Sequence, residues 1–188
     1  LMARLTKSPE RLGQFKPFYI YVPRHMKDLF LVEKELLKSK LIFVDRSKIL
    51  DDNLNLNNGL SLDSDNLDGL LGDSLGEINF YFQMADYIFI GNSFNELGAH
   101  NVIEPLALKK PVFVGPSIWG IEYPIIEALE AKVTVKVNNA DELYNLWLEI
   151  LSSGKKIHQS RDKFDEFYRR HSGAAERCLQ NLEKYGFI

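Results

Sequence analysis

The sequence predicts an α/β protein built around a doubly wound parallel sheet. Short runs of apolar, β-branched and aromatic residues alternate with helix-like stretches along the chain. Strands that alternate with helices are joined by crossovers and therefore run parallel. Glycine-containing loops and one helix start with unpaired amides are expected at a single edge of this sheet, which is where such sheets bind ligands.

The order of the elements follows from these runs. Continuous apolar runs predict buried strands at 18–22, 41–44, 67–71, 87–90, 112–114 and 133–137. Apolar residues at helical spacing predict helices at 26–39, 77–84, 124–130, 141–151 and, in two segments divided by Ser172 and Gly173, at 160–184. Residues 51–68 are rich in Asn, Asp, Leu and Ser without clean periodicity, so we interpret them as a long surface loop.

Composition limits both the size and the partners of the protein. With 188 residues, of which 45% are hydrophobic, the chain is expected to form one domain over residues 1–188 with a single sizeable core. Its net charge of −3 argues against nucleic acid as a partner, because a nucleic-acid surface needs a basic face. Cys178 is the only cysteine, so no intrachain disulfide can form and a reducing compartment is the simpler interpretation.

The sequence carries no signal for crossing a membrane. No apolar run approaches the roughly 18 residues that a membrane-spanning helix needs. The N-terminus lacks the apolar core of a signal peptide, so we expect this chain by itself to be soluble. Its opening residues, Leu1 to Arg4, lead directly into a helix-like stretch, as expected for a segment cut from a longer protein.

The stretch at 87–115, YIFIGNSFNELGAHNVIEPLALKKPVFVG, combines a strand, a glycine-containing loop, a helix start and a second strand. Pro105 has no N–H and fits only the first turn of a helix, so the helix must begin a few residues before it. The amides near Asn101 to Glu104 then have no partner inside the helix and lie at the positive end of its dipole. The expected ligand of such a helix start is an anion.

Two polar residues follow the first strand directly. Pro23 cannot donate to a strand ladder, so it ends the strand and places Arg24 and His25 at the carboxyl end. Open α/β sheets bind their ligands at this end. We interpret Arg24 as a ligand contact, with a solvated arginine as the alternative. His25 is either a ligand contact or a residue that braces the turn by hydrogen bonding.

The turn at 72–77 is a further candidate for ligand binding. Gly76 has no Cβ atom, which lets a flat ring approach the backbone closely. Glu77 stands at the start of a helix and is either a ligand contact or a carboxylate that complements the helix dipole. In the loop at 117–123, Trp119 either packs against the protein or borders the ligand site.

The pair Glu96 and Glu104 brackets the loop and the first helical turn of the central stretch. An ionised carboxylate accepts two hydrogen bonds, so Glu104 suits the cis-diol of a ribose, and a glutamate that only complements the helix dipole is the alternative. Glu96 either binds the ligand or orients the loop backbone. A phosphate would then lie over Ser93, Asn101 and neighbouring amides, with Arg24 as its counter-charge.

Neither a metal nor a redox cofactor is expected. The His and Cys residues do not cluster at ligand spacing, and the acidic segment at 63–65 lacks the glycine and the terminal glutamate of an EF-hand. The G-x-G-x-x-G fingerprint of dinucleotide-binding proteins and the Walker A loop are both absent.

Three blocks of sequence resemble the donor-binding half of glycosyltransferases that have two Rossmann-like domains, the glycosyltransferase-B fold. They are VPRH at 22–25, DSLGE at 73–77, and GNS at 91–93 followed by ELGAHNVIEP at 96–105. The resemblance is closest to the 3-deoxy-D-manno-octulosonic acid (Kdo) transferases of lipopolysaccharide assembly, in which the blocks occur in the same order. Two positions depart from the family pattern: Leu97 stands where Arg is usual, and Ala99 stands where Gly is usual.

The resemblance implies a function. Kdo transferases move Kdo from CMP-Kdo to lipid A precursor without a metal cofactor, at the cytoplasmic face of the inner membrane. This chain would be the C-terminal, donor-binding domain, while the general base and the contacts with acceptor and membrane would belong to an N-terminal domain outside it. The residues that would bind CMP-Kdo are Arg24, His25, Gly76, Glu77, Ser93, Glu96, Asn101 and Glu104.

Two alternatives remain open at this point. Recognition of ribose by a carboxylate is shared across the superfamily, so a related transferase that uses a UDP- or ADP-sugar is also compatible with Glu104. The second alternative is a non-catalytic Rossmann-like binding module, in which Asn101 and Glu104 only cap a helix. Competition between CMP and UDP distinguishes the first alternative, and absence of nucleotide binding favours the second.

Overall fold

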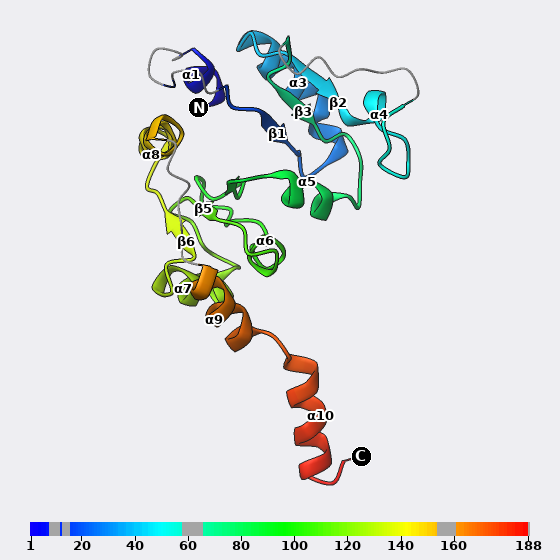
Figure 1. The fold of residues 1–188 in the computed structure, drawn as a ribbon, viewed down its shortest axis with the longest axis vertical. Helices are drawn as coiled ribbons and strands as arrows, with labels where there is room; N and C mark the ends of the chain where they lie inside the picture. Colours follow the sequence, from blue (N-terminus) through cyan, green and yellow to red (C-terminus); the bar gives the residue numbers. More distant parts are fainter. Residues whose placement is uncertain (8–11, 13–15, 58–65, 154–160, 188) are drawn as a thin grey trace. The chain divides into compact units, whose positions relative to one another are not determined.

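A computed structural model describes residues 1–7, 12, 16–57, 66–153 and 161–187. The chain divides into two compact units, the first comprising 1–85 and 140–156 and the second comprising 86–139 and 157–188. The described strands form two three-stranded parallel sheets (Figure 1). The predicted α/β class with parallel strands is therefore confirmed, although the strands belong to two sheets and not to one. A single domain over residues 1–188 stays a prediction.

The first unit contains the sheet in which β3 lies between β1 and β2. Its strands are β1 (Tyr19–Tyr21), β2 (Phe43–Asp45) and β3 (Gly69–Leu71). Its helices are α1 (Met2–Thr6), η1 (Met26–Asp28), α3 (Leu29–Lys38), α4 (Arg46–Ile49), α5 (Ile78–Met84) and α8 (Ala140–Ser153). Because β3 is central, the segment that follows it is flanked by the ends of both other strands.

Apolar side chains from separate helices cover this sheet. Leu5 of α1 and Tyr144 of α8 form a buried cluster with Tyr19 of β1. Leu70 of β3 and Tyr81 of α5 belong to another cluster. Burial of such side chains is the main favourable term that holds short strands and helices together. The helix predicted at 141–151 is confirmed as α8, and its apolar face packs in the first unit.

The second unit contains a sheet in which β5 lies between β4 and β6. Its strands are β4 (Ile88–Phe89), β5 (Val112–Val114) and β6 (Thr134–Lys136). Its helices are α6 (Ile103–Ala107), α7 (Glu122–Glu130), α9 (Arg161–His171) and α10 (Ala174–Lys184). All three residues of β5 are fully buried, as expected for a continuous apolar run in the centre of a parallel sheet.

In the first unit, helix α4 differs from the prediction, and the expected loop at 51–68 is described only in part. Helix α4 was not predicted, because four residues are too few to show a helical period. In the expected loop at 51–68, the Asp51 carboxylate accepts hydrogen bonds from the backbone amides of Asn53 and Asn55, both at 2.9 Å. Hydrogen bonding from the Asn55 amide lowers the pKa of Asp51, so its carboxylate keeps its charge to a lower pH than an ordinary aspartate does. Residues 58–65 lie outside the described residues.

Within the described ranges, none of the helices is both long enough and apolar enough to cross a bilayer.

Candidate functional site

The predicted residues of the first unit lie at the carboxyl edge of its sheet. β1 and β3 are parallel neighbours, and Tyr21 lies opposite Leu71 at the end of their pairing. The Gly72 amide donates to the Tyr21 carbonyl at 2.9 Å, which extends this contact by one residue. The segments 22–25 and 73–77 therefore leave the sheet at the same edge, as the sequence predicted for a ligand site.

Arg24 and His25 are both exposed. His25 has extended backbone and precedes η1, whose turn is closed by the Asp28 amide donating to the His25 carbonyl at 2.9 Å. His25 thus braces the turn through its backbone, while its imidazole remains on the surface. A ligand contact for either side chain stays a prediction.

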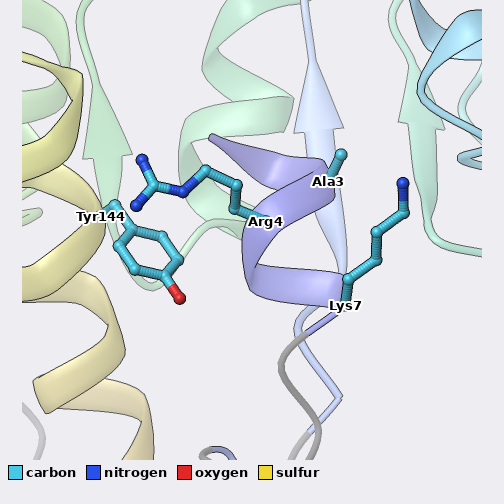
Figure 2. A pocket seen from close by; sticks show the side chains of 4 residues that line it. All are labelled: Ala3, Arg4, Lys7 and Tyr144. Atoms are coloured by element: carbon cyan, nitrogen blue, oxygen red, sulfur yellow. The ribbon is translucent and has the colours of Figure 1, made fainter.

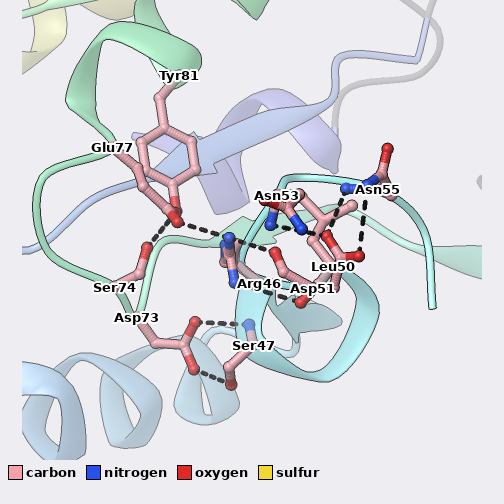
Figure 3. A network of polar contacts seen from close by, with 10 residues as sticks. All are labelled: Arg46, Ser47, Leu50, Asp51, Asn53, Asn55, Asp73, Ser74, Glu77 and Tyr81. Atoms are coloured by element: carbon pink, nitrogen blue, oxygen red, sulfur yellow. Dashed lines mark hydrogen bonds and ion pairs between the residues drawn. The ribbon is translucent and has the colours of Figure 1, made fainter.

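Gly76 and Glu77 face opposite environments within one turn. Gly76 has φ of +82°, and a Cβ atom at this position would meet nothing within 4 Å, so its face is open. The Glu77 carboxylate is hydrogen-bonded by side chains of the protein itself (Figure 3). One of its oxygens accepts from Arg46 Nη2 at 2.5 Å, and the other accepts from the Ser74 hydroxyl and from the Tyr81 hydroxyl, the latter at 3.4 Å. Both carboxylate oxygens of Glu77 are therefore engaged by the protein itself.

The Tyr81 hydroxyl completes this network as a neutral donor. Burial raises the pKa of Tyr81 above its ordinary value of 10.0, and the charge of Glu77 raises it further, whereas the hydrogen bond with Ser74 acts in the opposite direction. Tyr81 is accordingly protonated at neutral pH. It therefore donates a hydrogen bond to the Glu77 carboxylate.

Arg46 is a candidate residue that the sequence analysis missed. It is only 4% exposed, and besides Glu77 it donates to the carbonyl oxygens of Leu50 at 3.2 Å and Asp51 at 2.7 Å. A buried charge is stable only when it is paired and hydrogen-bonded. These three contacts therefore compensate for the loss of water around the Arg46 guanidinium. One signal was present in the sequence: Arg46 directly follows the second strand, at the edge where ligand sites lie.

In the second unit, Ser93 joins the ends of two strands. Its side chain is fully buried, and its hydroxyl donates to the Ile90 carbonyl at 2.7 Å and accepts from the Gly115 amide at 2.8 Å. These contacts connect the segment after β4 with the segment after β5. The Ser93 hydroxyl therefore has a structural role, and a phosphate contact of this residue stays a prediction.

The loop at 92–98 is held by asparagine side chains. Asn92 has a left-handed backbone with φ of +67°, and its Nδ2 donates to the Gly98 carbonyl at 2.9 Å. Asn95 donates to the Asn92 side chain at 2.5 Å, and its own oxygen accepts from the Leu97 amide at 2.9 Å. These asparagines perform the backbone-orienting role that the sequence analysis considered for Glu96. Glu96 itself is exposed at the tip of the loop.

Gly98 lies against the loop that contains Trp119, and only glycine fits there. Its φ is +83°, and an added Cβ atom would stand 2.3 Å from the Trp119 carbonyl oxygen. Trp119 is 70% exposed, so only a minor part of it packs, and the choice between a packing role and a ligand contact stays a prediction. Both the Trp119 backbone and the Cε3 edge of its indole lie close to Gly98.

We predict that Gly98→Ala destabilises the protein far more than Gly120→Ala. Both glycines have a positive φ, but a Cβ atom at Gly120 would meet nothing within 4 Å. Both variants bear the cost of a left-handed alanine, and only Gly98→Ala adds a clash with backbone, worth about 1–3 kcal/mol more. Urea unfolding of the two variants measures the difference. Equal free energies of unfolding for the two variants would mean that the loops at 92–98 and 117–123 can move apart without loss of stability.

Asn101 and Glu104 are brought together at the start of α6. The Asn101 side chain accepts from the Ile103 amide at 2.9 Å and donates to Glu104 Oε1 at 3.1 Å. Helix α6 begins at Ile103, and Pro105 lies in its first turn, as predicted. The Ile103 amide, however, already has a partner in Asn101. The start of α6 is thus less open to an anion than the sequence indicated.

The described part of the first unit also contains a shallow pocket of about 310 Å³ between α1 and α8 (Figure 2). It is lined by Ala3, Arg4, Lys7 and Tyr144, and the Arg4 guanidinium lies 4.0 Å from the centre of the Tyr144 ring. Arg4 also pairs with Asp141 of α8, so its charge is used to join the two helices. None of the residues predicted to bind a ligand lines this pocket.

Among the residues that the structure describes, no group of three or more His, Cys, Asp or Glu side chains is arranged to hold a metal ion.

Comparison with known proteins adds evidence that is independent of this geometry. The 3-deoxy-D-manno-octulosonic acid transferase of Bordetella pertussis is 28% identical over 170 residues, which cover 90% of this chain and 37% of that protein. The enzyme of the same name from Haemophilus influenzae is 29% identical over 170 residues, covering 88% of this chain and 36% of its own length. This chain is a relative of the Kdo transferases. The resemblance inferred from the three sequence blocks is thereby confirmed. No protein-family model matches the chain.

A solved structure extends the relationship to the Kdo transferases. The C-terminal CMP-Kdo binding domain of WaaA from Acinetobacter baumannii superposes with a TM-score of 0.65 and 26% sequence identity, covering 78% of this chain and 71% of that one. The expected half of a glycosyltransferase-B fold is confirmed by this likeness. The chain spans little more than a third of the length of the curated Kdo transferases it matches.

Proposed function

We propose that this chain is the donor-binding domain of a Kdo transferase and that it binds CMP-Kdo. The proposal rests above all on the likeness to the CMP-Kdo binding domain of WaaA, at a TM-score of 0.65 and 26% identity. It is supported by the position of two sequence blocks, 22–25 and 73–77, at the carboxyl edge of one parallel sheet.

Two of the candidate residues have a local geometry that suits part of a nucleotide. Gly76 offers an open backbone face for the cytosine ring, because no side chain stands in front of it. Glu104 accepts hydrogen bonds from the ribose hydroxyls. Its Oε1 already accepts from Asn101, but a carboxylate oxygen has two lone pairs, so the ribose and Asn101 can share it.

The charge of the donor suits the single arginine that the three sequence blocks supply. CMP-Kdo carries one phosphate between the nucleoside and the sugar, and a single phosphate needs less positive charge than the diphosphate of a UDP- or ADP-sugar. Arg24 is the proposed counter-charge for that phosphate. We further propose that the exposed Glu96 and His25 complete the donor site, and that no metal takes part in it.

We place the acceptor side of the reaction outside this chain. Lipid A precursor, the general base and the contacts with the cytoplasmic face of the inner membrane would belong to an N-terminal domain of the full-length enzyme. This assignment is supported by the length of the relatives, of which the chain covers 37% and 36%.

The first test of the proposal is nucleotide selectivity. We expect calorimetry on the 188-residue chain to show tighter binding of CMP than of UMP, AMP or UDP. The reason is that CMP, UMP and AMP share the ribose and the single phosphate and differ in the base, which we place at the open face of Gly76, while UDP carries a second phosphate that the site does not need. The control is cytidine, which lacks the phosphate and should bind more weakly than CMP.

Each alternative function has its own signature in this experiment. Preference for UDP or ADP over CMP would indicate a transferase with a different sugar donor. No binding of any nucleotide would indicate a non-catalytic module, in which the Asn101 and Glu104 hydrogen bond serves only to start α6.

A further inference from the structure

The turn at 73–77 is attached to α4 at both of its ends (Figure 3). At one end, the Asp73 carboxylate accepts from the Ser47 amide at 2.8 Å and from the Ser47 hydroxyl. At the other end, the Glu77 carboxylate accepts from Arg46 at 2.5 Å. Arg46 and Ser47 are consecutive residues of a helix of only four residues, so one short element holds the whole turn.

The two attachments differ in burial and therefore in how firmly they hold. The Arg46 side chain is 5% exposed and that of Glu77 is 19% exposed, so their ion pair is shielded from water and salt. The Ser47 contacts with Asp73 are exposed. Because a charge-assisted bond in a shielded place is stronger than one in water, the Arg46 contact is the firmer of the two.

Arg46 is in turn oriented by its own helix and the turn after it. Nη1 donates to the Leu50 carbonyl and Nη2 to the Asp51 carbonyl, in addition to Glu77. A planar guanidinium can serve several acceptors at fixed angles, which a lysine cannot do. The position of Glu77 is therefore set by the position of α4, and the open face of Gly76 lies next to Glu77 in the same turn.

We propose that Arg46 is a positioning residue of the donor site: it holds the 73–77 turn, through Glu77, in the conformation that presents Gly76 to the nucleotide. In this arrangement Glu77 accepts the hydrogen bond from Arg46 and does not touch the ligand. The inference rests on the proposed function, because it takes the open face of Gly76 as the place of the base. It assigns Glu77 a role different from the ligand contact that the sequence suggested.

The test is a double-mutant cycle on CMP affinity with Arg46→Met and Glu77→Gln. Residues that act on a site without touching its ligand change affinity by about two- to thirtyfold, so we expect each single variant to bind CMP more weakly within that range. The double variant should bind no more weakly than the weaker single variant, because both changes break the same contact. If Glu77→Gln weakens binding further in the Arg46→Met background, Glu77 touches the ligand and the proposal is wrong.

Arg46→Met removes the cationic partner of the Glu77 carboxylate, which is only 19% exposed, and can unfold the chain. Arg46→Lys is the milder variant, because lysine keeps the positive charge but lacks the planar guanidinium that donates to several acceptors at once. We expect it to weaken CMP binding by at least about twofold. The matched control is Lys48→Met, which removes an exposed cation from the same helix and should leave CMP affinity unchanged. The proposal would be overturned if Arg46→Lys bound CMP with wild-type affinity and the 73–77 turn exchanged its amide hydrogens no faster than in the wild type.

Amide hydrogen exchange at residues 73–77, measured without nucleotide, provides a readout that does not depend on the ligand. We expect exchange to accelerate there in Arg46→Lys while exchange in β3 stays slow, which a general loss of stability would not produce. If the wild-type chain binds no CMP, the proposed function fails, and exchange at 73–77 still decides whether Arg46 holds the turn. Unchanged exchange in the variant would contradict the inference in either case.

Discussion

The 188-residue chain alone is expected to bind CMP-Kdo and to transfer no Kdo. In the proposed reaction, an acceptor hydroxyl forms a bond to the anomeric carbon of Kdo while the bond from that carbon to the CMP phosphate breaks. A base must remove the hydroxyl proton, and acceptor and base must stand within bonding distance of the sugar. Transfer assayed with CMP-Kdo generated in situ and lipid A precursor should therefore stay at the level without enzyme.

A full-length Kdo transferase relative provides the positive control in the same assay. The difference should be large, because correct placement of two reactants is worth roughly 7–11 kcal/mol of the barrier. Turnover by the chain near the full-length rate would place the catalytic base within these residues. The candidates would then be His25, Glu77, Glu96 and His100, of which Glu77 is the least suited because its carboxylate is already paired with Arg46.

Glu104→Gln is expected to lower CMP affinity about tenfold or more. The substitution keeps the shape of the side chain and removes its charge, and a hydrogen bond to a charged group contributes roughly 1.5–3 kcal/mol. The Asn101 contact with position 104 can survive, because glutamine retains a carbonyl oxygen in the same place. Calorimetry with CMP measures the loss.

Glu122→Gln is the matched control for this variant. Glu122 also stands at the start of a helical segment of the second unit and is exposed, and the backbone of Tyr123 and Pro124 after it is not helical. Each substitution removes one negative charge near a helix start, so each should cost at most about 1 kcal/mol of stability. Only Glu104→Gln should weaken CMP binding. Affinity within about twofold of the wild type in Glu104→Gln would assign Glu104 to starting α6 and remove its ribose role.

Local sequence patterns predicted most of the elements because short segments carry their own signals. The run at 112–114 is apolar throughout, and it became the buried central strand β5 with the predicted boundaries. Pro105 indicated a helix start just before it, and α6 begins at Ile103. The run that became β4 was too long by two residues, because strand ends depend on pairing and not on composition.

The roles of individual side chains were harder to predict because they depend on distant partners. The sequence could not show that the Ser93 hydroxyl is buried against Gly115, 22 residues away. For Trp119 it left a packing role and a ligand contact as alternatives, and the residue is 70% exposed. A serine in a glycine-containing loop and a tryptophan in another loop look the same in sequence whether they face a ligand, the solvent or the interior.

The α/β class, the parallel direction of the strands and the relationship to the Kdo transferases could be inferred from local patterns, because periodicity and the three blocks are local properties of the chain. The position of β3 between β1 and β2, and the pairing of the Glu77 carboxylate with Arg46, 31 residues before it, became visible in the folded structure alone. A carboxylate at a helix start has the same local sequence whether it is solvated or paired. The choice depends on which distant side chain the packing of the sheet brings within reach, since burying an arginine is stable only where its partners are already in place.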